Sequence, residues 1–203
     1  PEDKMTVFAV LMRLREICCD PRLVADNWTG SSAKLEACLE LVTEAVAGGH
    51  RILLFSQFTS MLELLAKRLD EAGVSHFTLQ GSTPKPVRAE QVRRFNQGEA
   101  DVFLISLRAG GTGLNLTAAD IVIHYDPWWN LAAQNQATDR AYRIGQRNPV
   151  QVYRLIAQDT IEEKIVELQQ AKQSLADTVT GGADGAILSM NPEQLLQLLG
   201  EEA

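Results

Sequence analysis

Two arginines three residues apart, Arg140 and Arg143, have the clearest capacity for chemistry in this chain. On a helix this spacing places both side chains on the same face. Guanidinium groups are permanently charged and fork onto phosphate oxygens, so the pair can stabilise negative charge on a phosphoryl group during its transfer. Surface ion pairing, for example with the adjacent Asp139, is the alternative explanation.

Two glycine-containing loops could also handle phosphate. The segment AGGTG at 109–113 has three glycines in four residues, which let the backbone approach a ligand closely. The tripeptide Gly81-Ser82-Thr83 offers N–H groups and two hydroxyls at an expected helix start, where an anion can bind. A tight turn and a capped turn are the respective alternatives. Because the chain contains no GxxxxGK[ST] segment, neither loop is a Walker A phosphate loop.

Adjacent tryptophans, Trp128 and Trp129, follow an Asp-Pro pair near the end of an apolar run. They could be core residues, a surface for a partner, or a platform for a nucleic-acid backbone or base. Large aromatic side chains are usually well buried, so we expect at least one of the two in the core.

The hydrophobic pattern predicts the elements that must position these side chains. Short apolar runs predict strands at 51–56, 76–79, 102–106, 121–124 and 150–156. Amphipathic spacing and capping residues predict helices at 4–18, 33–48, 59–72, 84–96, 131–142 and 160–176. Strands and helices that alternate in this way predict a three-layer α/β domain with a mostly parallel sheet. Such sheets bind their ligands in the loops after the strands, where the glycine loops lie.

Composition allows one domain with a sizeable core, since 45% of the 203 residues are hydrophobic. The net charge of −7 lies entirely in the tail: residues 1–156 carry 17 basic and 17 acidic side chains, whereas residues 157–203 carry 2 and 9. A weak basic groove on the body is compatible with this balance, although composition does not require one. Three cysteines without a CxxC pair, and histidines without ligand spacing, predict a reducing compartment with no disulfide framework and no structural metal.

The chain divides into three parts. We expect an N-terminal helix and loop (1–32), a central domain (33–158), and a C-terminal helix with an acidic, partly mobile tail (159–203). No apolar run reaches the length of a membrane span, and no signal peptide opens the chain. The chain starts at Pro1 without Met and enters a helical pattern at once, as expected for a fragment of a larger polypeptide or for a processed protein.

Four segments, in this order, resemble motifs of the Swi/Snf-type ATPases, which are superfamily 2 DNA translocases. They are ILLFSQF (52–58), GSTPKPVRAEQVRRFN (81–96), LISLRAGGTGLNLTAADIVIHYDPWWN (104–130) and QATDRAYRIGQ (136–146). The similarity is to the second RecA-like lobe of that family, and the RIGQ and AGGTGLNL strings are highly specific. The helix at 160–176 resembles the one that follows this lobe, especially in bacterial members. The resemblance implies a RecA-like, P-loop NTPase-type α/β domain with a C-terminal helical extension.

The resemblance also implies roles for the residues at matching positions. The arginine fingers, which reach ATP held by the other lobe, would be Arg140 and Arg143. The nucleotide-binding or coupling residues would be Gly111, Gly113, Asn115, Gln136 and Asp139. The residues along the DNA track would be Ser56, Gln57, Gly81, Ser82, Thr83, Arg88, Thr112, Asp126 and Trp128. Contacts made by amides, hydroxyls and arginines read phosphate geometry rather than base sequence.

The implied function is the C-terminal half of an ATP-dependent double-stranded DNA translocase. ATP with Mg would be held mainly by the first RecA-like lobe of the same polypeptide, so this chain alone should not hydrolyse ATP. Double-stranded DNA and that lobe are the expected partners, with no membrane, in the bacterial cytoplasm or nucleoid. A stand-alone α/β interaction module with relic ATPase motifs and a strand-separating helicase are the alternatives. Chromatin-like remodelling, transcription recycling and repair all stay open as the biological task.

Overall fold

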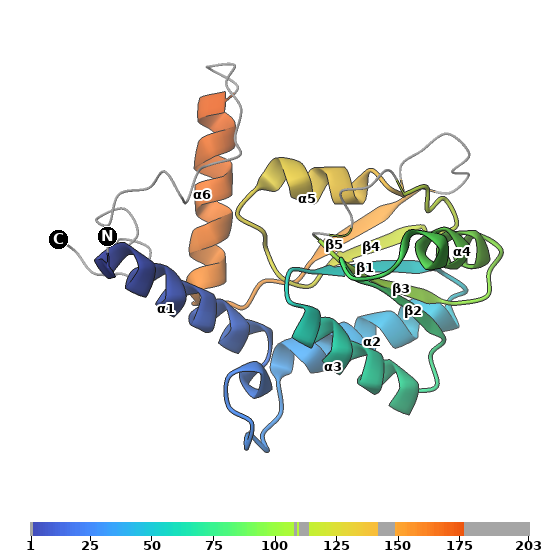
Figure 1. The fold of residues 1–203 in the computed structure, drawn as a ribbon, viewed down its shortest axis with the longest axis horizontal. Coiled ribbons are helices and arrows are strands. Elements are labelled where there is room, and N and C mark those ends of the chain that lie inside the picture. Colours follow the sequence, from blue (N-terminus) through green and yellow to red (C-terminus); the bar gives the residue numbers. More distant parts are fainter. Residues whose placement is uncertain (1, 108, 110–113, 142–148, 177–203) are drawn as a thin grey trace.

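A sheet of five parallel strands forms the centre of the molecule (Figure 1). In this computed structural model the described residues are 2–107, 109, 114–141 and 149–176. The strands are β1 (Ile52–Ser56), β2 (His76–Leu79), β3 (Val102–Ser106), β4 (Ile121–His124) and β5 (Gln151–Arg154). Their order in the sheet is β2-β3-β1-β4-β5, and every neighbouring pair is parallel. The register pairs Ser56 with Ser106 and Phe55 with His124, so these strands end together at one edge.

Six α-helices are present in the described part of the chain. They are α1 (Glu2–Cys19), α2 (Ala33–Ala47), α3 (Thr59–Glu71), α4 (Lys85–Asn96), α5 (Leu131–Thr138) and α6 (Ile161–Ala176), and a 3-10 turn, η1 (Pro21–Leu23), follows α1. None of these helices is both long enough and apolar enough to cross a membrane. The helix expected at 131–142 is shorter in the structure, because the chain leaves α5 after Thr138 and the Arg140 carbonyl accepts a hydrogen bond from the Leu116 N–H at 3.2 Å.

Both faces of the three central strands, β1, β3 and β4, are buried, as their continuous apolar runs require, whereas the edge strand β5 is largely exposed. Side chains at alternate strand positions point to opposite faces. Leu54 and Leu104 join the apolar cluster formed with α2 and α3, whereas Phe55 and Ile105 join the cluster formed with α4 and α5. Figure 1 shows these two pairs of helices on opposite sides of the sheet. The expected three-layer α/β fold is confirmed.

The helices α1 and α6 pack against each other beside the sheet. Leu11 of α1 lies against Ile161 and Ile165 of α6. A buried ion pair also ties α6 to α2, since Lys34 Nζ lies 2.5 Å from Glu162 Oε2 and both side chains are almost fully buried. The first and last described helices are therefore packed onto the central domain.

Replacing Glu162 by Gln tests how much this buried ion pair stabilises the fold. The change leaves the Lys34 ammonium buried without its counter-charge, so we expect a loss of about 3–5 kcal/mol of unfolding free energy, measured by chemical denaturation. The double variant Lys34→Met/Glu162→Leu is the control, because it removes both charges and should recover most of the stability. A loss below about 1 kcal/mol for Glu162→Gln, the range of exposed pairs, would contradict this assignment.

His124, the last residue of β4, makes stability depend on pH. Its Nε2 lies 2.8 Å from Thr138 Oγ1, and its ring stacks on Phe55 with the ring centroids 5.5 Å apart. Burial, together with the nearby charge of Arg154, lowers the pKa of His124 to about 4. Because the unfolded pKa is about 6.5, the neutral ring contributes its full stability above that pH, and the contribution is lost as the pH falls through the folded pKa.

The His124→Gln variant tests this pH dependence. Between about pH 7 and about pH 4, wild type should lose up to about 3 kcal/mol more unfolding free energy than the variant. Denaturation curves of both proteins across this range measure the difference, and the variant serves as the control for all carboxylates that titrate in the same range. Parallel curves for the two proteins would show that His124 does not carry the effect.

Candidate functional site

A groove of about 670 Å³ opens at the edge of the sheet where β1, β2, β3 and β4 end. Its lining combines these strand ends with one side of α1. The lining residues are Met12, Glu16, Gln57, Phe58, Thr59, Ser60, Gln80, Gly81, Ser82, Ser106, Leu107 and Trp128. Among the described lining residues Glu16 is the one with a charged side chain, and most of the other polar groups there are hydroxyls and amides.

Ser56 and Asp126 join the ends of β1 and β4 beneath this groove. Both are buried, and the Ser56 hydroxyl donates to Asp126 Oδ1 at 2.5 Å. Gln57 donates its backbone N–H at 3.3 Å and its side-chain amide at 3.0 Å to the same carboxylate. The Gln57 amide also donates to the Pro127 carbonyl at 2.9 Å. The structure thus brings three of the expected DNA-track residues together, with Gln57 at the groove and the other two below it.

Arg15 completes this cluster, and the sequence analysis did not single it out. It is 1% exposed, and its Nη2 donates to the Pro127 carbonyl at 2.9 Å and lies 4.0 Å from Asp126 Oδ2. The guanidinium also lies over the ring of Trp129, 5.1 Å from its centroid. One signal was available in the sequence: Arg15 follows Leu11 by four residues, so it falls on the buried face of its helix.

The turn after β2 lines another part of the groove. Gly81 and Ser82 are exposed there. Thr83 closes the turn, since its Oγ1 accepts the Gln80 N–H at 3.0 Å and its own N–H donates to the Gln80 carbonyl at 3.0 Å. The hydroxyl of Thr83 is therefore engaged in the turn, and the exposed groups at this point belong to Gly81 and Ser82.

Arg88 lies in the second turn of α4 and is half-buried. Its Nη1 donates to the Ala109 carbonyl at 3.5 Å, which connects α4 to the loop that follows β3. The expected site residues Gly111, Thr112 and Gly113 belong to that loop and lie outside the described residues.

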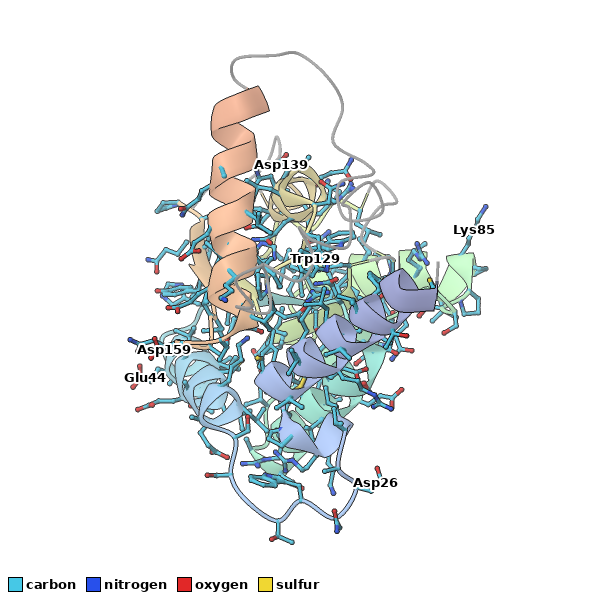
Figure 2. The ribbon with its side chains drawn as sticks, turned by 90° about the vertical axis from the view of Figure 1, so that its left-hand side faces the viewer. Asp26, Glu44, Lys85, Trp129, Asp139 and Asp159 are labelled. Carbon is cyan, nitrogen blue, oxygen red and sulfur yellow. The ribbon has the colours of Figure 1, made fainter. Side chains whose placement is uncertain are left out.

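The end of α5 carries the residues expected to face a nucleotide. Gln136 and Asp139 are exposed, and Asp139 lies at the helix end (Figure 2). Arg140 follows directly and is 3% exposed. Asn115 is exposed. It lies near Arg140, because the next residue, Leu116, donates its N–H to the Arg140 carbonyl. Arg143 lies outside the described residues.

The two tryptophans have different surroundings. Trp128 is half-buried and lines the groove, with its backbone N–H donated to Gln134 Oε1 at 3.1 Å and its carbonyl accepting from the Gln169 amide. Trp129 lies between α1 and α6 and packs on their apolar cluster (Figure 2). One tryptophan is therefore part of the packing between helices, and the other belongs to the site. The buried amides of Gln134 and Gln169, which hold Trp128 in place, were not foreseen from the sequence.

Comparison with known proteins gives a consistent result. Residues 33–145 match the family model of the helicase conserved C-terminal domain. An uncharacterized ATP-dependent helicase of Mycoplasma pneumoniae is 39% identical over 198 residues, which are 97% of this chain and 19% of the relative. A putative ATP-dependent helicase/translocase of Bacillus subtilis is 41% identical over 201 residues, which are 96% of this chain and 22% of the relative. The chain thus spans about a fifth of the length of these relatives.

A solved structure extends the comparison to the fold. The SWI2/SNF2 ATPase core of Sulfolobus solfataricus in complex with dsDNA superposes with a TM-score of 0.77 and 31% identity, over 97% of this chain and 42% of that one. This core is therefore similar to the present chain both in sequence and in fold. The chain therefore belongs to the helicase conserved C-terminal domain family, as the second RecA-like lobe of the Swi/Snf-type superfamily 2 ATPases.

Proposed function

We propose that this chain is the C-terminal half of an ATP-dependent double-stranded DNA translocase. One observation carries the proposal. The groove of hydroxyl and amide groups lies where four strands of the sheet end, and the buried Arg140 follows α5, the helix that comes after the last of these strands, β4. The names of the relatives support it, since they are helicases or a helicase/translocase, and the similar Sulfolobus core binds dsDNA.

On the nucleotide side, Arg140 and Arg143 are the proposed arginine fingers. ATP with Mg²⁺, held by the first lobe, supplies the phosphoryl group to be transferred. Among the residues that the structure describes, no group of three or more His, Cys and acidic side chains is placed to hold a metal ion. The guanidinium groups fit a different task, which is to stabilise charge that develops on the phosphoryl oxygens. The coupling residues of this proposal are Gly111, Gly113, Asn115, Gln136 and Asp139.

On the DNA side, the proposed contacts follow the groove. Gln57, Ser82 and Trp128 line it. The Ser82 hydroxyl and the Trp128 indole can meet phosphate and sugar, whereas the Gln57 amide donates to Asp126 and Pro127 and shapes the groove wall. The remaining contacts of this proposal are Gly81, Thr83, Arg88 and Thr112. Ser56 and Asp126 are buried and act from below by fixing Gln57. Groups of this kind recognise the phosphate backbone of a duplex and are indifferent to its sequence.

Substituting the finger arginines in the full-length protein tests the nucleotide side. We expect Arg140→Ala and Arg143→Ala each to lower the turnover number of DNA-stimulated ATP hydrolysis by about 10³-fold or more, because each removes a charge that stabilises the transition state. Binding of a fluorescent ATP analogue should stay unchanged. Arg140→Lys, which keeps a charge at this buried position, and a thermal melt separate a catalytic loss from misfolding.

Two controls accompany this test. Arg93→Ala removes the same charge from the exposed surface of α4, where Arg93 pairs with Glu90, and should leave turnover unchanged. The isolated 203-residue chain should show no ATP hydrolysis. Turnover near the wild-type level in either finger variant, or robust hydrolysis by the isolated chain, would overturn the assignment.

Replacing Arg88 by Ala tests the DNA side. If Arg88 contacts a phosphate, the variant should bind duplexes more weakly, and the slope of log affinity against log salt should become less steep by about 1. Fluorescence anisotropy with several duplexes of unrelated sequence, each titrated over a range of salt concentrations, measures both quantities. Arg93→Ala, on the same helix, is the matched control and should keep the wild-type slope. A weakening confined to one DNA sequence would argue against backbone recognition.

A further inference from the structure

The buried guanidinium of Arg15 needs an explanation beyond stability. It lies on α1, outside the residues that match the family model, and its side chain is 2% exposed. Its surroundings are the Pro127 carbonyl at 2.9 Å, the Asp126 carboxylate at 4.0 Å, and the rings of Phe58 and Trp129. Its Nε has no hydrogen-bond partner among the described residues.

The energetic cost of this arrangement is high. Burial lowers the pKa of the Arg15 guanidinium, and the Asp126 carboxylate opposes that shift, so the group keeps its charge at neutral pH. A buried ion pair contributes little net stability compared with apolar side chains of the same volume. An apolar residue at position 15 would therefore satisfy packing, and the charge must serve another purpose.

The partners of Arg15 show what the charge does. The Pro127 carbonyl accepts from both Arg15 and the Gln57 amide, each at 2.9 Å. The Asp126 carboxylate lies between the same two side chains, 4.0 Å from the guanidinium and 3.0 Å from the amide. Arg15 thus acts on both acceptors that orient the Gln57 amide: it donates a hydrogen bond to the Pro127 carbonyl, and its charge offsets that of the Asp126 carboxylate. Without it, a buried negative charge would lie directly behind a residue that lines the groove.

We propose that Arg15 is a positioning residue for DNA: it neutralises Asp126 and fixes Pro127, the two acceptors of the Gln57 amide hydrogens, so that Gln57 keeps its place in the groove wall and no uncompensated negative charge lies behind a bound phosphate. The inference rests on the proposed DNA-binding function of the groove. It makes α1 part of the DNA-binding surface, although Arg15 itself stays covered by the groove residues. Asp126, in turn, acts on DNA through Gln57 and not by direct contact.

Variants of the full-length protein that remove or keep the charge at position 15 test this role. Arg15→Met keeps the volume and removes the charge, and should weaken duplex affinity about tenfold, raising the DNA concentration for half-maximal ATPase without changing the turnover at saturating DNA. Arg15→Lys should recover part of the affinity. The double variant Arg15→Met/Asp126→Asn should bind within about threefold of wild type, because the uncompensated carboxylate is gone. A purely structural role would also let the double variant recover stability, so the affinities are compared under conditions in which thermal melts show every variant to be fully folded.

Leu11→Ala is the matched structural control. It loosens the packing of α1 on α6 without touching the Asp126 cluster, so its DNA affinity should equal that of wild type once a thermal melt confirms folding. If Leu11→Ala weakens DNA binding as much as Arg15→Met, or if the double variant binds as weakly as Arg15→Met, the inference is wrong.

Amide hydrogen exchange provides a readout that does not depend on DNA. The Gln57 N–H donates to Asp126, so it should exchange at least about tenfold faster in Arg15→Met than in wild type, while the core amide of Leu104 stays protected. If wild type binds no duplex, the proposed function fails, and this exchange rate still decides whether Arg15 holds Gln57. An unchanged exchange rate in Arg15→Met overturns the positioning role whatever the DNA result.

Discussion

Parallel pairing of the strands is the constraint on which the rest of this structure depends. A parallel connection must carry the chain back to the edge from which the previous strand started, and α3 and α4 make two of these returns. As a result β1, β2, β3 and β4 deliver their following residues to the same edge. Gln57, Ser82 and Trp128, which are far apart in sequence, meet in one groove for this reason. The same pairing buries both faces of the central strands β1, β3 and β4, so the polar groups of the groove lie where these strands end.

This confinement explains how charge is distributed in the lobe. Apart from Glu16, which pairs with Arg13, the described lining of the groove contains hydroxyl, amide and apolar groups, whereas the Asp126 carboxylate beneath it is buried and paired. Asp126 faces Arg15, and Glu162 faces Lys34. Each pair joins a helix outside the sheet to the central domain. The pairs therefore fix where α1 and α6 lie, and they keep uncompensated charge away from a surface that would meet phosphate.

The sequence predicted the elements well, because a buried parallel strand leaves an unmistakable apolar run and helices leave caps. RILLFS and VFLIS are such runs, and Gly73, with a φ of 70°, ends α3 as expected of a helix C-terminus. The end of α5 was predicted too late, since its local pattern continues while a distant partner, the Leu116 N–H, takes the Arg140 carbonyl. Tertiary contacts of this kind leave no local signal.

Arg15 shows the same limit for the site. Pattern analysis treats a charged residue as exposed, and the partner that makes its burial possible lies 112 residues further along the chain. The family resemblance pointed to Asp126 and Gln57, but it could not reveal that one lies beneath the other. Which residues face a ligand and which support them is decided by burial, and burial depends on the packing of α1, β1 and β4 together.

The short segment between Trp128 and Arg140 connects the two halves of the proposed function. α5 is bonded to the region around β4 at two points: the Trp128 N–H donates to Gln134 in the middle of the helix, and Thr138 at its end bonds to His124. The helix cannot shift against the groove without breaking these two partly buried hydrogen bonds. A pull on the arginine end would therefore move the groove with it, as one body. Under the proposed function, translocation would then come from hinge-type motion of this lobe as a unit and would need no rearrangement within its sheet.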